Sequence, residues 1–155
     1  SQNARDALVK AVKIAKNAGR KVALTLSDVL CVDRHRYDFI ELIDKNIDIL
    51  FANEEEIISL YEANDFEEAI KKVANSCALS VLTRGEKGSV FVTNNMVKMN
   101  KANTINPVDT TGAGDAYAGG FLYGLSQNKS LEDCAILGTD IATKVVSQFG
   151  ARPNT

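Results

Sequence analysis

The sequence predicts an α/β fold, with short parallel strands alternating with helices in a single domain over residues 1–155. Helical patterns and short apolar runs alternate through the first half, as in doubly wound folds with right-handed crossovers. The runs are apolar throughout, which is typical of parallel strands covered on both faces. Ligands of such sheets bind beyond the carboxyl ends of the strands, so the loops there are the candidate site.

The first half divides into elements by hydrophobic spacing and by the residues that cap helices. In chain order we expect a helix over 4–18, a strand over 22–26, a helix over 33–45, a strand over 47–51, helices over 54–62 and 65–75, and a strand over 79–82. Asp33 and Asp65 are the expected N-caps of the helices that they open. Gly19 is the expected end of the first helix.

The second half contains turn signals and two longer helical patterns. We expect a turn over 84–88, a hairpin over 90–93 and 96–99 around Asn94-Asn95, a glycine-rich loop over 109–114, and helices over 115–126 and 131–148. Ser130 should begin the last helix, with Glu132 and Asp133 in its first turn. Gly119 and Gly120 weaken the helix that contains them, and close packing is their expected use.

Composition excludes several classes of protein. The net charge of −2 provides no basic field for nucleic acid or an anionic membrane. No apolar run approaches the roughly 20 residues of a transmembrane helix. The three cysteines are scattered, which favours reduced thiols and a cytoplasmic protein over disulfides or a zinc site. Because the chain opens at Ser1 in a helical pattern, we expect it to be part of a longer protein.

The strongest chemical signal is the loop from Asp109 to Asp115, which precedes a helix of small residues. Gly112 and Gly114 let backbone amides turn inward, and the free N–H groups of the helix face the same point. This arrangement is suited to binding phosphate. Asp115 would repel a phosphate, so its presence favours a general base that takes a proton from an attacking hydroxyl. The alternative is that Asp115 only caps the helix.

Two further loops follow apolar strands. Asn53-Glu54-Glu55-Glu56 could hold Mg²⁺ through water, although three glutamates at a helix start also favour its dipole. Thr83 to Gly88 is by itself an ordinary turn. His35, among charged neighbours, is expected in a solvated charge cluster. The chain contains neither a P-loop motif nor a dinucleotide-binding Gly-x-Gly-x-x-Gly after a strand.

Taken together, these motifs resemble the ribokinase or PfkB family of carbohydrate and nucleoside kinases. The resemblance rests on the Asn-x-x-Glu, Thr-x-Gly-x-x-Gly and Gly-Ala-Gly-Asp elements in this order, and it covers the whole chain as the C-terminal half of the family's fold. Within the family, adenosine kinase-like sugar kinases are the most similar. The resemblance implies a three-layer α/β/α Rossmann-like, ribokinase-like fold, here partial and without the lid.

The resemblance also implies a role for each motif. Asp115 would be the general base, and the amides of Gly112, Ala113 and Gly114 would form the anion hole. The residues implied in binding the nucleotide and its Mg²⁺ are Asn53, Glu56, Thr83, Gly85, Gly88 and Thr139, the last at the start of the final helix. Those implied in a monovalent-cation (K⁺) site are Asp109, the carbonyl of Thr111, and the turn at Gly150.

The implied function is ATP-dependent phosphorylation of a primary alcohol on a nucleoside, such as adenosine, or on a sugar. The family's N-terminal half supplies the substrate pocket and the lid, so we expect the 155-residue chain alone to be inactive. One alternative is a sugar kinase of the ribokinase or fructokinase type. Others are a non-catalytic nucleotide-binding module derived from such a kinase, and a purely structural α/β domain.

Overall fold

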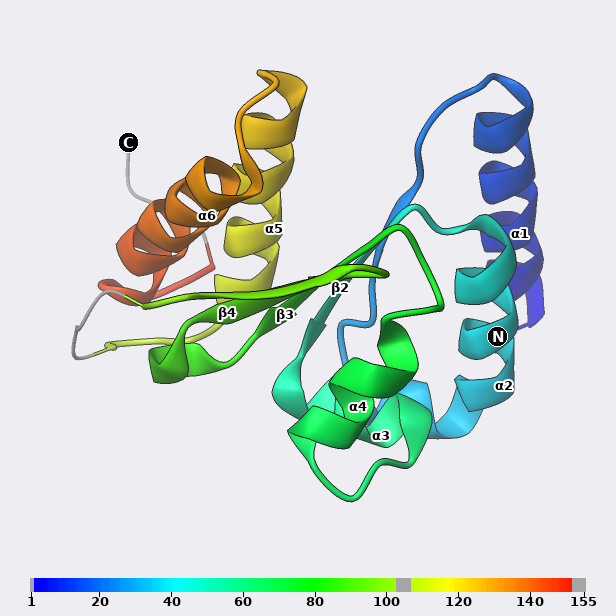
Figure 1. The fold of residues 1–155 in the computed structure, drawn as a ribbon, viewed down its shortest axis with the longest axis horizontal. Helices are drawn as coiled ribbons and strands as arrows, with labels where there is room; N and C mark the ends of the chain where they lie inside the picture. The colour runs from blue at the N-terminus through cyan, green and yellow to red at the C-terminus, as the bar shows by residue number, and fades with distance from the viewer. Residues whose placement is uncertain (1, 103–106, 152–155) are drawn as a thin grey trace. The chain divides into compact units, whose positions relative to one another are not determined.

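The structure is a computed structural model that describes residues 2–102 and 107–151. It divides into two compact units, each described here by itself. The first comprises Ser1–Leu82 with Val92–Val97, and the second comprises Thr83–Phe91 with Lys98–Thr155. Figure 1 shows the chain coloured from its N-terminus to its C-terminus. Within the described residues, none of the helices has both the length and the hydropathy needed to cross a membrane.

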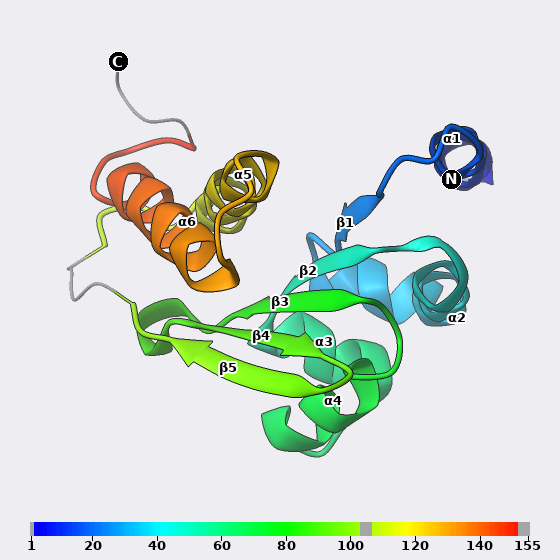
Figure 2. The same cartoon turned by 45° about the horizontal axis from the view of Figure 1, so that its top comes forward.

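The strands form one sheet in the order β1-β2-β3-β4-β5, which Figure 2 shows. Their bounds are Ala23–Thr25, Ile49–Asn53, Leu79–Thr83, Ser89–Thr93 and Met96–Asn100. β1 pairs in parallel with β2, with Ala23 opposite Ile49. A two-residue turn at Asn94-Asn95 joins the neighbouring strands β4 and β5, so these two run antiparallel. The predicted α/β fold and its hairpin are therefore confirmed.

Burial along the strands agrees with the apolar runs of the sequence. The first four residues of β2, β3 and β4 are all buried, whereas the first four of β5 are all exposed. A strand that buries successive residues is covered on both faces, because successive side chains point to opposite sides. β5 is the strand at one edge of the sheet, and Met96, Val97 and Met99 are exposed along it.

Four helices accompany the strands of the first unit. They are α1 (Gln2–Asn17), α2 (Val29–Asn46), α3 (Glu54–Tyr61) and α4 (Phe66–Val73). α3 and α4 lie side by side on one face of β2 and β3 (Figures 1 and 2). The fully buried core of this unit includes Val32, Ile43, Leu50, Ile57, Leu60 and Val81. Asp65 caps α4 as predicted, since its carboxylate accepts from the amide of Glu68 at 2.8 Å.

Helix α2 begins earlier than predicted. Its N-cap is Asp28, whose Oδ1 accepts from the amide of Leu30 at 2.8 Å, so the prediction that Asp33 caps this helix is wrong. Both aspartates precede a helical pattern, but only Asp28 stands where the chain leaves β1 and still has extended backbone, as an N-cap requires. His35 is exposed and its Nδ1 lies 3.9 Å from Asp38, which agrees with a solvated charge cluster.

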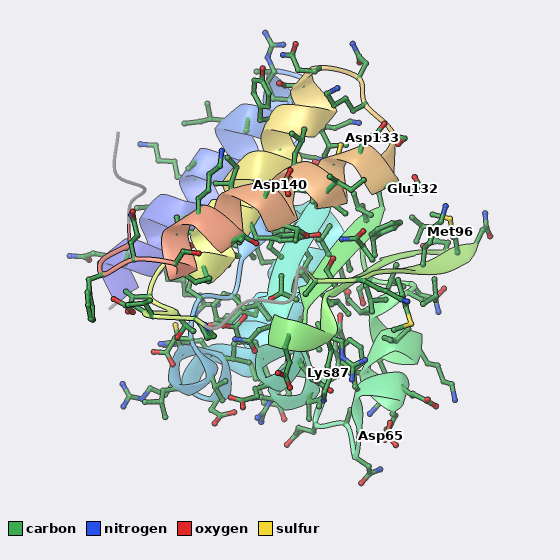
Figure 3. All side chains as sticks on the ribbon, turned by 90° about the vertical axis from the view of Figure 1, so that its left-hand side faces the viewer. Asp65, Lys87, Met96, Glu132, Asp133 and Asp140 are labelled. Atoms are coloured by element: carbon green, nitrogen blue, oxygen red, sulfur yellow. The ribbon has the colours of Figure 1, made fainter. Side chains whose placement is uncertain are left out.

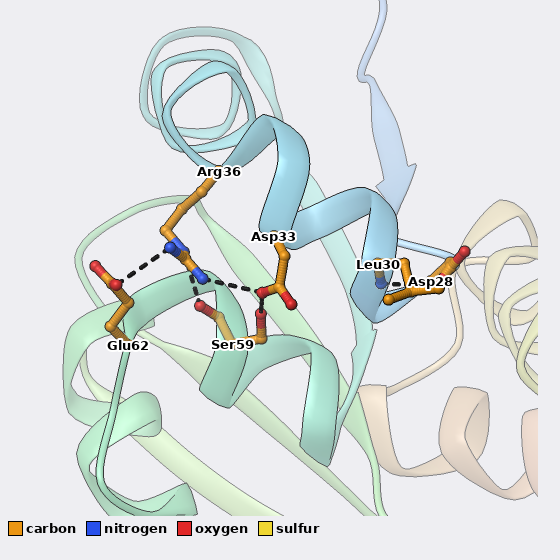
Figure 4. A network of polar contacts seen from close by, with 6 residues as sticks. All are labelled: Asp28, Leu30, Asp33, Arg36, Ser59 and Glu62. Atoms are coloured by element: carbon orange, nitrogen blue, oxygen red, sulfur yellow. Dashed lines mark hydrogen bonds and ion pairs between the residues drawn. The ribbon is translucent and has the colours of Figure 1, made fainter.

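Asp33 instead joins α2 to α3 through a polar network (Figure 4). Its carboxylate accepts from the hydroxyl of Ser59 and from Nη2 of Arg36, the latter at 3.0 Å. Arg36 also donates through Nε to the carbonyl of Ser59 at 3.0 Å and through Nη1 to Glu62 at 3.1 Å. The Arg36 side chain is less exposed than its partners, so this cluster is more than a solvated surface pair.

The second unit contains a short 3₁₀ turn, η1 (Gly85–Lys87), and two helices, α5 (Ala113–Ser126) and α6 (Leu131–Val146). Ser130 caps α6 as predicted, accepting from the amide of Asp133 at 3.1 Å. Glu132 and Asp133 lie in the first turn of α6, as Figure 3 shows. Negative charge at this end of a helix is favourable.

Glycines let α5 and α6 approach closely. A Cβ added to Gly120 would lie 2.7 Å from the carbonyl oxygen of Leu137, and one added to Gly124 would lie 2.8 Å from Sγ of Cys134. Gly138 of α6 is equally close to α5, with 2.8 Å between an added Cβ and the carbonyl oxygen of Tyr117. The close packing expected of these glycines is found at Gly120, which approaches α6. It is not found at Gly119, where an added Cβ would meet nothing within 4 Å.

Candidate functional site

The glycine-rich loop ends at the start of α5. Gly112 is the N-cap, with a left-handed φ of 77° that glycine adopts without strain. An added Cβ at Gly112 would also lie 2.8 Å from the Cβ of Ala151. The helix begins at Ala113 rather than at the predicted residue 115, so Asp115 lies inside the first turn. The interpretation of Asp115 as the helix cap is thereby excluded.

The first turn of α5 carries exposed residues. The first N–H groups of a helix have no partner within it. Gly114 and Asp115 are both exposed residues, and an added Cβ on Gly114 would meet nothing within 4 Å. The Ala113 amide donates to the carbonyl of Thr110 at 3.2 Å, a long bond within the tight turn. This helix end fits an anion such as phosphate.

Asp115 is exposed at the same helix end. Its carboxylate has no hydrogen-bond or ion-pair partner among the residues that the structure describes. An exposed carboxylate next to free amides can accept a proton from a bound hydroxyl. This is the chemistry that the sequence motif predicts for this position.

Asp109, at the N-terminal end of the glycine-rich loop, stabilises this loop through two hydrogen bonds. Its Oδ1 accepts from the amide of Thr111 at 2.8 Å, and its Oδ2 accepts from the amide of Gly150 at 3.0 Å. Hydrogen bonds from the Thr111 side chain, then from the Thr111 and Gly150 amides, hold the pKa of Asp109 below its usual range. The structure thus brings together the three residues of the predicted cation site, Asp109, Thr111 and Gly150.

The turn from Thr83 to Gly88 closes through its own backbone. The amide of Arg84 donates to the carbonyl of Gly88 at 2.8 Å, and the amide of Gly88 donates to Gly85 at 3.0 Å. Gly88 has a φ of 94°, and an added Cβ there would lie 2.0 Å from the carbonyl oxygen of Asn100. Gly85, with a φ of 57°, faces open space. Lys87 projects from this turn (Figure 3).

Thr139 lies in the middle of α6, not at its start as predicted. Its hydroxyl donates to the carbonyl of Ala135 at 2.8 Å and accepts from Nδ2 of Asn100 at 3.3 Å. Asn100 therefore stands between Gly88 and Thr139, two of the predicted nucleotide-binding positions. No signal in the sequence marks Asn100, because a lone asparagine at the end of a strand resembles a turn residue.

Asn53 and Glu56, in the first unit, form a reciprocal cap on α3. Oδ1 of Asn53 accepts from the Glu56 amide at 2.8 Å. Oε2 of Glu56 accepts from the Asn53 amide at 2.9 Å, and its Oε1 accepts from Nδ2 of Asn53 at 2.9 Å. Glu56 is 6% exposed, so this is a buried carboxylate held by a capping box.

We expect Glu56→Gln to lower the free energy of unfolding by about 1–2 kcal/mol. Both carboxylate oxygens accept hydrogen bonds from Asn53, and the amide group of glutamine would face one of these donors with another donor. Urea denaturation measures the change. Glu55→Gln, an exposed neighbour in the same first turn, is the matched control and should stay within about 0.5 kcal/mol of the parent. Equal effects of the two substitutions would contradict the capping role.

The predicted site residues fall into both units. Asp109 to Asp115, the turn at 83–88, Thr139 and Gly150 belong to the second unit, and Asn53 and Glu56 belong to the first. Among the described residues, no three His, Cys, Asp or Glu side chains are grouped to hold a metal ion. Mg²⁺ in kinases is bound by one or two carboxylates together with phosphate oxygens.

A cavity of about 530 Å³ lies elsewhere, between α1 and α2. None of the predicted site residues lines it, and its wall is largely apolar, with Leu8, Val9, Phe39 and Leu42. The Asp109–Asp115 motif and the N-terminal amides of α5, which suit an anion, lie outside this cavity. We therefore place the candidate site at α5.

The model of the pfkB family of carbohydrate kinases matches residues 1–155. A cytidine kinase of Thermococcus kodakarensis is 39% identical over 119 residues, which cover 74% of this chain and 42% of the relative. The adenosine kinase structure of Sinorhizobium meliloti has a TM-score of 0.95 at 44% identity and covers 98% of this chain and 47% of that one.

A third similar protein is the fructokinase of Vibrio cholerae O395, whose structure is in a form bound to fructose, ADP and calcium ion. Its TM-score is 0.89 at 26% identity, and the match covers 100% of this chain and 55% of that one. The chain thus spans about half the length of the proteins that it matches.

Proposed function

Because the chain belongs to the pfkB family of carbohydrate kinases, we propose that it carries the phosphoryl-transfer site of an ATP-dependent kinase. The acceptor is a primary alcohol of a nucleoside or a sugar. The observation that carries this proposal is the start of α5, where an exposed carboxylate, Asp115, lies among the first backbone amides of the helix. Anion binding alone has no use for that carboxylate, whereas transfer to a hydroxyl needs a base.

In the proposed reaction Asp115 takes the proton of the attacking hydroxyl. The amides of Gly112 and Gly114, with that of Ala113 once its long bond to Thr110 opens, hold the transferred phosphoryl oxygens. Their charge-stabilising effect is greatest in the transition state, where negative charge spreads over those oxygens. Mg²⁺, when bound with the nucleotide, would neutralise part of the phosphate charge.

Other residues would hold the nucleotide and its ions. Thr83, Gly85 and Gly88 would line the nucleotide, and Thr139 would form part of the pocket for its adenine ring. Asn53 and Glu56 would organise Mg²⁺ and phosphate oxygens from the cap of α3. Asp109, the Thr111 carbonyl and the Gly150 turn would bind K⁺, and the ionised Asp109 carboxylate supplies the charge for a cation there.

A nucleoside is our first choice of acceptor, because the chain is 44% identical to an adenosine kinase and 39% identical to a cytidine kinase. A sugar acceptor is the second choice, favoured by the likeness to a fructokinase at 26% identity. A non-catalytic nucleotide-binding module is the third. Asp115 is exposed and has no partner among the described residues, which argues against it, since a module that only binds phosphate would be better without this charge.

The test is ADP formation by the full-length protein with ATP, Mg²⁺ and a panel of adenosine, cytidine, ribose and fructose. We expect ADP formation to depend on a nucleoside, with K⁺ raising the rate. Formation with only the sugars would move the assignment to a sugar kinase. An ATP-induced thermal shift without any acceptor-dependent ADP would indicate a binding module. The absence of both would leave only a structural domain.

A further inference from the structure

Tyr117 is a buried aromatic residue in α5 that the proposed mechanism does not use. It follows Asp115 by less than one turn of the helix and is only 5% exposed. Its hydroxyl lies 2.7 Å from the hydroxyl of Ser89, which is itself 1% exposed. Both groups belong to the second unit. A hydrogen bond between two buried hydroxyls is costly to break, because neither group can turn to water.

The bond joins two parts of the candidate site. Ser89 opens β4 directly after Gly88, the last residue of the turn proposed to line the nucleotide. Tyr117 belongs to the same helix start as Asp115 and the anion-hole amides. The bond therefore ties the nucleotide turn to the helix that carries the base. It connects residues 28 positions apart in the chain.

Tyr117 also reaches the third segment of the site. A Cβ added to Gly138 would lie 2.8 Å from the Tyr117 carbonyl oxygen and 3.1 Å from its ring. Gly138 directly precedes Thr139, which is proposed to form part of the pocket for the adenine ring. The ring of Tyr117 stacks on Phe121, with 6.2 Å between centroids, so the side chain has little freedom to move. Burial raises the pKa of Tyr117 to about 12, so its hydroxyl keeps its proton at physiological pH.

We propose that Tyr117 is a positioning residue, whose hydrogen bond to Ser89 sets the distance between the nucleotide turn and Asp115. This inference rests on the proposed kinase function. Tyr117 touches neither nucleotide nor acceptor and acts through the backbone of the segments that it joins. Misplacement of reacting groups by about 1 Å can cost 10²-fold in rate. A phenylalanine would preserve the packing of the ring and remove only the bond.

The first test is the kinetics of Tyr117→Phe in the full-length protein. We expect kcat/KM for ATP to fall about tenfold, with a lower kcat and a higher KM for ATP, while KM for the acceptor is unchanged. Tyr123→Phe is the matched control, because it makes the same change on the same helix at a tyrosine that is 59% exposed. Its kinetic constants should stay within about twofold of the parent.

A double-mutant cycle with Ser89→Ala isolates the bond. If the two hydroxyls act only through each other, the double variant loses no more activity than either single variant. Fully additive losses would overturn the inference. So would a Tyr117→Phe variant with a lower Tm and parental kcat and KM, because that pair of results describes a bond with a purely structural role. If Tyr117→Phe does not fold, Ser89→Ala answers the same question.

Hydrogen exchange of the Ala113 and Ala116 amides, which donate to the carbonyls of Thr110 and Gly112, separates this inference from the proposed function. Loss of the bond should speed their exchange in Tyr117→Phe and leave it unchanged in Tyr123→Phe. If the parent protein shows no kinase activity, the proposed function fails while this measurement still reports on positioning. Unchanged exchange at Ala113 and Ala116 would overturn the positioning role even in an active enzyme.

Discussion

Replacing Asp115 by asparagine is expected to lower the turnover of the full-length protein by roughly 10²-fold or more, the usual contribution of a general base. Asparagine has nearly the same shape but cannot take a proton from the acceptor hydroxyl. The carboxylate is exposed and has no partner among the described residues, so its loss should leave the fold intact. Removing its charge from the anion-binding helix end should leave ATP binding as tight or tighter.

Steady-state kinetics and ATP titration together check this result. Asp133→Asn is the matched control, since Asp133 occupies the same third position of the next helix, α6, after the cap Ser130. Its turnover should remain within about twofold of the parent. A fully active Asp115→Asn protein would rule out the base, and weaker ATP binding without loss of turnover would reassign Asp115 to nucleotide binding.

The second large effect is expected on stability. Gly88→Ala should lower the free energy of unfolding by about 3 kcal/mol or more, combining backbone strain with an overpacked contact. The backbone at Gly88 has a φ of 94°, and the new Cβ would lie 2.0 Å from a backbone oxygen of Asn100. That oxygen belongs to the end of β5, so the clash is relieved only if the strand end moves.

Gly85→Ala is the control for this substitution. Gly85 lies in the same turn with a φ of 57°, but an added Cβ meets nothing within 4 Å. It should therefore show only the cost of left-handed backbone, about 1 kcal/mol. Urea denaturation of both variants gives the comparison. If Gly88→Ala cost no more than Gly85→Ala, the close approach to Asn100 would not be a real constraint.

The fold could be predicted where local signals agree. Asp65 and Ser130 each precede a helical pattern and cap it as expected. The start of helix α2 could not be predicted in this way, because Asp28 and Asp33 are both plausible caps in the sequence. Which of them caps depends on where the chain leaves β1, and this is decided by pairing with β2, a contact distant in sequence.

In the candidate site, too, local motifs could be predicted from the sequence and contacts between distant residues could not. Asp115 and its glycines form one continuous motif, and the structure places them at a helix start as the motif predicts. The Ser89–Tyr117 and Asn100–Thr139 bonds join residues 28 and 39 positions apart, and no local pattern marks either pair. Tyr117 in particular resembles any core aromatic of an amphipathic helix until its hydroxyl partner is known.

The two backbone bonds of Asp109 have a thermodynamic consequence. They fix the start of the glycine-rich loop, at Asp109 to Thr111, and join it to Gly150 in the absence of any ligand. The conformational entropy of this loop is therefore lost when the chain folds, before the proposed nucleotide would bind. At the proposed site an anion would therefore meet a loop that is already ordered, and we expect the entropic penalty of its binding there to be small.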